Sequence, residues 1–403
     1  MARTAQAGRP CRRSHRRARP GGAAGARRMS SVRWRLPPAT RPGPASAPGR
    51  PWLPLTGGGD QLLCLPVILA GRPITALLDS GASRSVLDRR WAASAGLDCP
   101  TGQQLAGLTA TVSAQTARPL TIRIGDTQLP PISPAVLDLA HLSAAARTRI
   151  DLVLGQEAFL HNRVEIDPDR MVVRFCPRQA SIVGEDWHHL VRTRDKLFCL
   201  EVELGRGLRM PAVVDLGSSI PLYAARKFVD GANLLEGRPH STSASVGVEG
   251  LSVSTVTRLS RLNIGGHQLT EVPLSIPQCW NLDAPIVIGA PLLWRFHSIL
   301  DLGAGRLRLH PAAGFDAPFV ADRSGLHVVA GPDCLEIIHI SPGSPAAASG
   351  LQVGDAIVTV DDEPITARFL AENRNLGRRP TGMSYRIGVR GKPPHLLTLA
   401  DYY

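Results

Sequence analysis

Apolar and polar residues alternate in short stretches along most of the chain beyond residue 60. A period of two residues is typical of half-buried β-strands, and the 39 glycines and 34 prolines supply turns between them. We therefore expect a mainly β protein. The pattern predicts strands over 62–69, 74–79, 107–113, 119–125, 132–137, 151–154 and 164–175, and short helices over 85–96, 155–162, 221–231 and 289–296.

This pattern occurs twice in the chain. The stretch "LLCLPVILAGRPITALLDSGAS" (62–83) corresponds to "LFCLEVELGRGLRMPAVVDLGSS" (197–219), and "DLVLGQEAFLHNRVEID" (151–167) corresponds to "PIVIGAPLLWRFHSILD" (285–301). Such self-similarity indicates an internal duplication.

The spacing of the landmark residues supports the duplication. Gly155 follows Asp79 by 76 residues, and Gly289 follows Asp215 by 74 residues. We therefore predict two homologous β-barrel lobes in tandem. The predicted domains are a disordered tail over 1–55, lobe 1 over 56–185, lobe 2 over 190–315 and a C-terminal module over 320–403.

Three Asp-x-Gly steps end apolar strands, at Asp79, Asp215 and Asp301. The repeat aligns Asp301 with Asp167, not with Asp79. "VEIDPDRMVVRF" and "SILDLGAGRLRLH" both have an aspartate at the first position of a tight turn between two strands. At that position a carboxylate can accept hydrogen bonds from the following backbone N–H groups. We expect Asp167 and Asp301 to cap turns, which leaves Asp79 and Asp215 as a candidate pair.

Two symmetric lobes that each carry one aspartate on a tight turn can bring two carboxylates face to face. Like charges so close cannot both ionise, so the pair shares a proton. The ionised member can act as general base on a water while the protonated member polarises a carbonyl. The glycines after the two aspartates, Gly81 and Gly217, allow a backbone that a β-carbon would obstruct.

"ALLDSGAS" followed by "DLVLGQEAF" resembles the active-site strand and the later apolar-apolar-Gly segment of retropepsin-like aspartic peptidases. With both lobes in one chain, the arrangement is similar to that of pepsin-like enzymes. The resemblance implies an aspartic-type endopeptidase that hydrolyses peptide or protein substrates without a cofactor or a metal. It implies catalytic roles for Asp79 and Asp215, a hydrogen-bonding grip role for Ser80, and an active-site loop made of Ser80, Gly81, Ala82, Leu216, Gly217 and Ser218.

Lobe 2 departs from the family pattern at Leu216, which has no hydroxyl, so half of the reciprocal hydrogen bonding between the lobes is missing. Ser218 and Ser219 lie just beyond it. The candidate flap, "LAGLTATVSAQTARP" (105–119), contains no tyrosine and is closer to a retroviral flap. Two alternatives stay open: a non-catalytic peptide-binding protein with a degenerate second lobe, and a peptidase whose site is completed by Asp79 of a second chain.

The pattern changes in the C-terminal part. "CLEIIHI" followed by "SPGSPAAASGLQVGDAIVTVDDEPI" resembles a bacterial-type PDZ domain. PDZ domains add an extended peptide to a sheet edge and hold its carboxylate with backbone N–H groups. The resemblance implies a C-terminal peptide as ligand. It places the carboxylate loop and edge strand at Ser324, Gly325, Leu326, His327 and Val328. A module that only packs on the lobes or pairs chains is the alternative.

The net charge of +13 belongs to the N-terminal tail. Residues 1–50 contain 13 of the 46 basic residues and no acidic one, which leaves 33 basic against 33 acidic residues elsewhere. A tail with almost nothing to bury is expected to be disordered. A nucleic-acid- or membrane-binding arm, a targeting segment and an unstructured extension are the alternatives for it, and nucleic-acid binding is disfavoured.

The sequence contains no clear signal peptide and no run long enough to span a membrane. The compartment stays open, with the cell envelope suggested only by family resemblance. Seven cysteines without C-x-x-C spacing do not support a zinc ribbon or a thioredoxin-type site. "DWHHL" (186–190) is expected to be a solvated linker and not a metal site.

Overall fold

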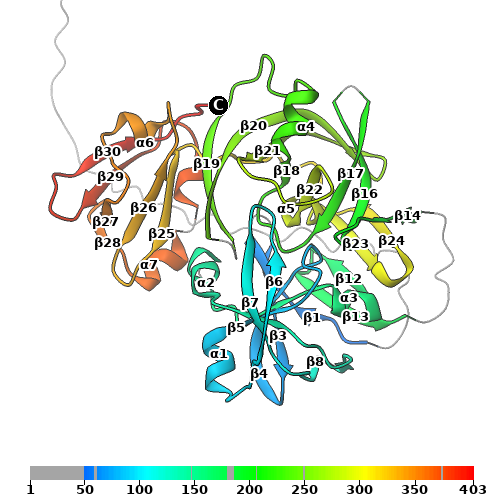
Figure 1. Cartoon of the computed structure of the whole chain (residues 1–403). Coiled ribbons are helices and arrows are strands. Elements are labelled where there is room, and N and C mark those ends of the chain that lie inside the picture. The colour runs from blue at the N-terminus through cyan, green and yellow to red at the C-terminus, as the bar shows by residue number, and fades with distance from the viewer. Residues whose placement is uncertain are drawn as a thin grey trace, which may run out of the picture. The chain divides into compact units, whose positions relative to one another are not determined.

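The computed structural model describes residues 50–58, 61–146, 148–178, 186–205, 207–247, 250–373 and 375–403. These residues form a mainly β structure, as predicted, with their strands grouped into four sheets (Figure 1). Most of the predicted tail, residues 1–49, lies outside the described residues. Within the described ranges no helix has both the length and the apolar character needed to cross a membrane.

Lobe 1 is built around one sheet. Its elements are β2 (Thr56–Gly58), β3 (Gln61–Leu69), β4 (Arg72–Leu78), β5 (Val86–Asp88), α1 (Arg89–Ser94), β6 (Thr101–Ala106), β7 (Thr111–Thr116), β8 (Ile122–Ile124), β9 (Thr127–Gln128), β10 (Ala135–Leu137), α2 (Ala140–Ala146), β11 (Leu152–Leu154) and α3 (Gln156–His161). The strand order is β6-β7-β10-β5-β11-β4-β3-β8-β9, with β2 beside β3. The parallel pair β4 and β11 brings Leu78 opposite Leu154. The two repeated landmarks, the segments that end at Asp79 and Gly155, therefore lie side by side.

Three predicted elements of lobe 1 are wrong in part. The strand expected over 164–175 is two strands, Asn162–Asp167 and Val172–Pro177, joined by a turn. The helix expected over 85–96 begins as strand β5, because Val86 and Leu87 are buried between β10 and β11. The helix α1 starts only after Asp88, whose carboxylate accepts hydrogen bonds from the backbone of Arg90 and Trp91. The strand expected over 107–113 crosses the turn that joins β6 to β7.

Lobe 2 repeats the topology of lobe 1. Its elements are β15 (Val191–Arg192), β16 (Phe198–Leu204), β17 (Leu208–Asp215), β18 (Leu222–Ala224), α4 (Arg226–Gly231), β19 (Ser241–Gly247), β20 (Gly250–Ile264), β21 (His267–Pro277), β22 (Ile286–Gly289) and α5 (Ala290–Leu293). The order is β15-β16-β17-β22-β18-β21-β20-β19. Strand β17 is parallel to β22, and β18 is antiparallel to β22, as β4 and β5 are to β11. The predicted duplication is confirmed at the level of strand pairing.

The final hairpins of the two lobes share one further sheet. Its elements are β1 (Leu53–Pro54), β12 (Asn162–Asp167), β13 (Val172–Pro177), β14 (His188–His189), β23 (Phe296–Asp301), η1 (Leu302–Ala304) and β24 (Arg306–Pro311). In the order β1-β13-β12-β23-β24-β14, the antiparallel pair β12 and β23 joins lobe 1 to lobe 2. One apolar core runs through both lobes and this sheet.

The aspartates of these hairpins cap their turns, as predicted. The carboxylate of Asp167 accepts a hydrogen bond from Arg170 N at 3.1 Å, and that of Asp301 accepts one from Ala304 N at 3.3 Å. Asp301 also pairs with the guanidinium groups of Arg178 and Arg306. Neither carboxylate is available to pair with Asp79.

The C-terminal module has its own sheet and its own apolar core. Its elements are β25 (Leu326–Ala330), β26 (Leu335–Ile340), α6 (Pro345–Ala348), β27 (Ala356–Val360), β28 (Glu363–Pro364), α7 (Ala367–Glu372), η2 (Leu376–Arg378), β29 (Ser384–Val389) and β30 (His395–Thr398). The order is β25-β26-β27-β29-β30, with β28 beside β27. The predicted strand, short helix and closing hairpin are confirmed, and β25 is an end strand.

Candidate active site

Asp79 and Asp215 lie at the ends of equivalent strands. Asp79 N donates to Leu154 O at 3.0 Å after β4, and Asp215 pairs with Gly289 in the register of β17 and β22. Both residues are half-buried, and their carboxyl groups are close enough to share a hydrogen bond. The structure therefore brings the predicted pair together within one chain.

The backbone around the pair has approximate two-fold symmetry. Asp79 Oδ1 accepts a hydrogen bond from Ala82 N at 2.7 Å, and Asp215 Oδ1 accepts one from Gly217 N at 2.8 Å. The N–H of Gly81 also donates to Asp215. A β-carbon on Gly81 would lie 2.6 Å from Asp215 Oδ1, and one on Gly217 would overlap the carboxyl group of Asp79. The glycines are required here because each faces the carboxyl group of the opposite lobe.

One hydroxyl joins the two active-site loops. Ser80 Oγ donates to Val214 O at 2.7 Å and accepts from Leu216 N at 3.0 Å, and Ser80 is fully buried. Leu216 is buried as well but contributes only packing from its side chain. The predicted asymmetry is therefore present, and Ser80 alone provides both side-chain hydrogen bonds of the grip. Ser218 Oγ bonds the backbone of Ile220 in its own loop and does not substitute for the missing hydroxyl.

Sequence reasoning missed a buried network behind the loop of lobe 1. Gln156 Nε2 donates to Ser80 O at 3.1 Å. The carboxylate of Glu157 accepts from Ser85 N and Ser85 Oγ, both at 3.0 Å, and Gly155 N donates to Ser85 Oγ at 2.9 Å. These bonds fix the loop that carries Asp79. Gln156 has no counterpart in lobe 2, where the repeat places Ala290, so only the alignment of the two lobes could have drawn attention to it.

The surroundings of the pair disfavour two ionised carboxylates. Burial raises the pKa of Asp215 well above its usual range, and the neighbouring carboxylate of Asp79 raises it further. The N–H groups of Gly217 and Gly81 oppose this effect but do not cancel it. The surroundings therefore favour a pair in which one carboxyl group is protonated over a pair of two carboxylates.

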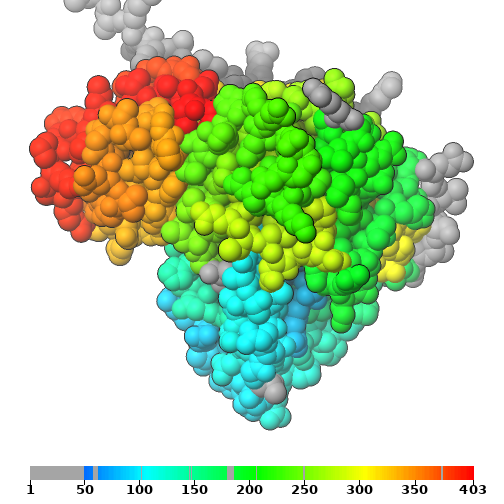
Figure 2. Space-filling model, turned by 45° about the horizontal axis from the view of Figure 1, so that its top comes forward, coloured from blue at the N-terminus to red at the C-terminus, as the bar shows by residue number. Residues whose placement is uncertain are grey.

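The hairpin β6–β7 is the candidate flap of lobe 1, and its tip contacts lobe 2. Asn281 N donates to Leu108 O at 2.9 Å, and Asn281 Nδ2 lies 3.3 Å from Gly107 O and 3.2 Å from Thr111 Oγ1. Leu108 packs with Tyr223 and the loop that precedes β22. In Figure 2 the cyan surface of lobe 1 meets the yellow-green surface of lobe 2. The flap is therefore latched to the opposite lobe.

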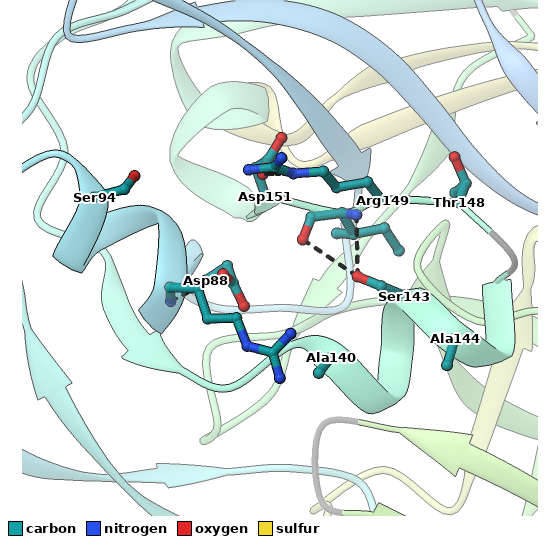
Figure 3. Close-up of a pocket in the computed structure, with 10 residues that line it drawn as sticks. Asp88, Ser94, Ala140, Ser143, Ala144, Thr148, Arg149 and Asp151 are labelled. Atoms are coloured by element: carbon teal, nitrogen blue, oxygen red, sulfur yellow. Dashed lines mark hydrogen bonds and ion pairs between the residues drawn. The ribbon is translucent and has the colours of Figure 1, made fainter. Parts of the chain in front are cut away.

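A separate cavity of about 690 Å³ lies in lobe 1 beside α1 and α2 (Figure 3). Its two carboxylates have structural partners. Asp88 caps α1 and accepts from Leu139 N at 3.1 Å, while Asp151 accepts from Thr75 N at 3.1 Å and pairs with Arg149. The cavity is therefore distinct from the aspartate pair and offers no second acid–base couple.

The segment "DWHHL" is more ordered than a linker. His188 and His189 form β14, which pairs with β24, and Asp186 forms an ion pair with Arg308 at 2.7 Å. Elsewhere in the described residues, Asp167, Asp169 and His297 lie close enough to hold a cation. His297 contacts the carboxylates of Asp167 and Asp169, which accounts for the cluster as a polar contact between the two lobes.

The residues predicted to form the carboxylate loop of the C-terminal module lie in a turn whose N–H donors are occupied. Asp322 Oδ1 accepts from Ser324 N at 3.0 Å, from Ser324 Oγ at 2.8 Å and from Gly325 N at 2.6 Å. Leu326 N donates to Ser324 Oγ at 3.1 Å. His327 and Val328 follow in β25, with a bulge between them.

Comparison with known families agrees with this geometry. Residues 65–158 match the model described as aspartyl protease, and residues 320–382 match the model of the PDZ domain. The chain carries both domains. No curated protein matches the chain. The aspartyl protease match covers Asp79 and the Gly155 segment of lobe 1, and the PDZ match covers the loop from Asp322 to Leu326. The resemblances to retropepsin-like peptidases and to PDZ domains are both confirmed.

Proposed function

We propose that the chain is an aspartic-type endopeptidase whose site is completed within one chain by Asp79 and Asp215. The juxtaposition of their carboxyl groups, between Gly81 and Gly217, is the observation that carries the proposal. A single-chain pair favours this function over a site completed by a second chain.

The chemistry requires one protonated and one ionised carboxyl group. Asp79, ionised, removes a proton from a water as the water oxygen attacks the peptide carbonyl, and Asp215 donates its proton to the carbonyl oxygen. Asp79 then passes the proton to the leaving nitrogen as the C–N bond breaks. Asp215 recovers a proton from the hydroxyl of the tetrahedral intermediate, and the pair returns to its starting state.

Ser80 and Gln156 position this pair, and the PDZ domain supplies a second place for polypeptide to bind. A PDZ sheet edge receives an extended segment as an added strand. We expect this domain to capture or present protein substrates to the aspartate pair. The flap hairpin would cover a substrate chain bound at the aspartate pair.

Cleavage of a peptide library by the full-length protein tests the proposal. We expect cleavage without added metal, and a loss as pH rises through the pKa of Asp215, because Asp215 must hold its proton. Asp79→Asn and Asp215→Asn are each expected to lower the rate at least about 1,000-fold. The exposed carboxylate of Asp98, which pairs with Arg118, provides the matched control Asp98→Asn.

A protein that binds peptides but cleaves none at any pH would support the non-catalytic alternative. Unchanged cleavage by Asp215→Asn together with loss in Asp79→Asn would favour a site completed by a second chain.

A further inference from the structure

The PDZ domain contains an apolar cavity of about 150 Å³ between β25 and α7. Leu326 and Val328 line it from the strand, and Phe369 and Leu370 line it from the helix. Among the described residues no strand pairs with the outer edge of β25. Helix α2 of lobe 1 lies beside β25. A polypeptide segment that adds to the unpaired edge would place one aliphatic side chain in the cavity.

The end of this cavity already contains a carboxylate. Asp322 and Ser324 both belong to its lining. Successive backbone N–H groups in such a turn form a concave anion site. Here the N–H groups of Ser324 and Gly325 donate directly to Asp322, and the N–H of Leu326 donates to Ser324 Oγ, which itself donates to Asp322.

The position of Asp322 is fixed from several sides. Arg323 N donates to Gly377 O at 2.7 Å, so the turn η2 closes over the loop. A β-carbon on Gly377 would overlap Asp322 Oδ2 and would lie 2.9 Å from Ser324 Oγ. Gly325 has φ +68°, and a β-carbon there would overlap Ser344. The loop is thus shaped around the internal carboxylate.

A ligand carboxylate entering this site would meet a second carboxylate and would find three N–H donors already used. Two carboxylates in one partly desolvated site repel each other, and an anion without donors loses its hydration with no replacement. Burial raises the pKa of Asp322, whereas the hydrogen bonds from Ser324 and Gly325 favour its ionised form.

We propose that the PDZ groove selects internal apolar segments of an extended polypeptide and rejects free C-terminal carboxylates, because Asp322 occupies the anion site of the loop. This inference rests on the peptide-binding part of the proposed function and narrows its ligand. It reverses the C-terminal ligand expected from the sequence resemblance.

Peptide binding to the full-length Asp79→Asn protein, which removes cleavage from the measurement, tests this inference. Three fluorescent probes share one apolar sequence that ends in Val: one has a free carboxylate, one has a C-terminal amide, and one continues for four further residues. We expect the amide and the extended probe to bind at least about tenfold more tightly than the acid. The three probes are compared on one protein with an unchanged loop, so the result does not depend on the folding of a loop variant.

Asp322→Asn in the same background keeps an acceptor oxygen for the loop and removes the charge. We expect the acid probe to gain affinity and its gap to the amide probe to narrow, because the charge repulsion is lost while the N–H donors stay engaged. Asp333→Asn, at an exposed turn residue that pairs with Arg390, is the matched control and should change neither probe.

Tighter binding of the acid than of the amide would overturn the inference and leave the protease proposal intact. Failure of all three probes to bind would overturn both the inference and the peptide-binding role. Cleavage by the unmodified protein would still decide the protease activity separately.

Discussion

At the scale of single residues, Ser80 connects the two active-site loops through one hydroxyl group. Its hydroxyl is the donor to Val214 O and the acceptor from Leu216 N, and both partners belong to the opposite lobe. An Ala at this position leaves a buried carbonyl and a buried N–H without partners. Each such loss costs about 1–3 kcal/mol.

We therefore expect Ser80→Ala to lower the free energy of unfolding by about 2–5 kcal/mol. Urea titration measures this change. Ser384→Ala removes an exposed hydroxyl that bonds only Thr398 and should cost less than about 0.5 kcal/mol. Equal costs for the two variants would mean that Ser80 does not hold the lobes together.

The glycines of the active-site loops give a second test at this scale. Gly217→Ala would push its β-carbon into the carboxyl group of Asp79. A displacement near 1 Å in an active site can cost about 100-fold in rate. We expect at least that loss in kcat/KM for cleavage, with the fold retained. Gly314→Ala, where a β-carbon would meet no atom within 4 Å, should leave kcat/KM unchanged.

Residue-level prediction from the sequence succeeded where the repeat supplied a second copy. The alignment of the lobes separated Asp79 and Asp215 from Asp301, and it exposed Leu216 as the missing hydroxyl. Gln156, Asn281 and Asp322 could not be found in this way. Their roles depend on backbone groups brought close by loops, and neither apolar periodicity nor a motif records such distances.

At the scale of elements, the flap hairpin β6–β7 depends on a contact with lobe 2. Asn281 bonds the flap tip through its backbone and its side chain, and Leu108 packs against a buried apolar cluster of lobe 2 that contains Tyr223. Strand β7 is mostly exposed or half-buried, and hairpins with little burial belong to the least stable parts of a fold.

We expect Asn281→Ala to raise the hydrogen-exchange rate of residues 101–116 by about tenfold, because the lost bonds are worth about 1–2 kcal/mol. Mass spectrometry of peptides that cover β6 and β7 measures this rate. Asn263→Ala, which removes a turn bond to Gly266 N within lobe 2, is the control. Unchanged exchange in the flap would mean that the side-chain hydrogen bonds of Asn281 do not stabilise the flap.

Element prediction was most accurate for strands with clear alternation, such as β3, and for the PDZ signature. It was weaker where a short apolar run allows either a strand or a helix. Val86 and Leu87 belong to a strand because β10 and β11 flank them. The same ambiguity recurs in lobe 2, where Leu222–Ala224 forms β18 before α4 begins.

At the scale of the whole molecule, lobe 2 and the PDZ domain meet through polar contacts. Thr242 in β19 bonds His339 Nε2 at 2.9 Å, and Ser341 Oγ donates to Thr242 O at 2.6 Å. His327 lies beside this junction, with its ring 5.4 Å from that of His339 and its Nε2 3.2 Å from Ser341 Oγ. Burial, reinforced by His339, lowers the pKa of His327 to about 4.

The lowered pKa of His327 determines how stability changes with pH. The unfolded chain binds a proton on His327 below about pH 6.5, whereas the folded chain does so only below about pH 4. Stability from this residue is complete above pH 6.5 and decreases as the pH falls toward 4. The loss between pH 7 and pH 5 is about 2 kcal/mol.

His327→Gln should remove this pH dependence. We monitor urea unfolding by hydrogen exchange in β25 and β26. Between pH 7 and pH 5 the free energy of unfolding should fall by about 2 kcal/mol less in the variant than in the unmodified chain. His141→Gln, at an exposed position in α2, should keep the pH dependence of the unmodified chain. Identical losses in all three proteins would contradict the assignment to His327.

The grip through Ser80 has a consequence for how the two halves of this duplicated chain can change. In a symmetric pair of identical subunits, a substitution at the grip position changes the residue in both subunits. Here the two copies of that position are uncoupled: position 80 is restricted to a small hydroxyl, whereas position 216 is free to hold other buried aliphatic residues. A saturation library should show this as a narrow tolerance at the first position and a broad one at the second.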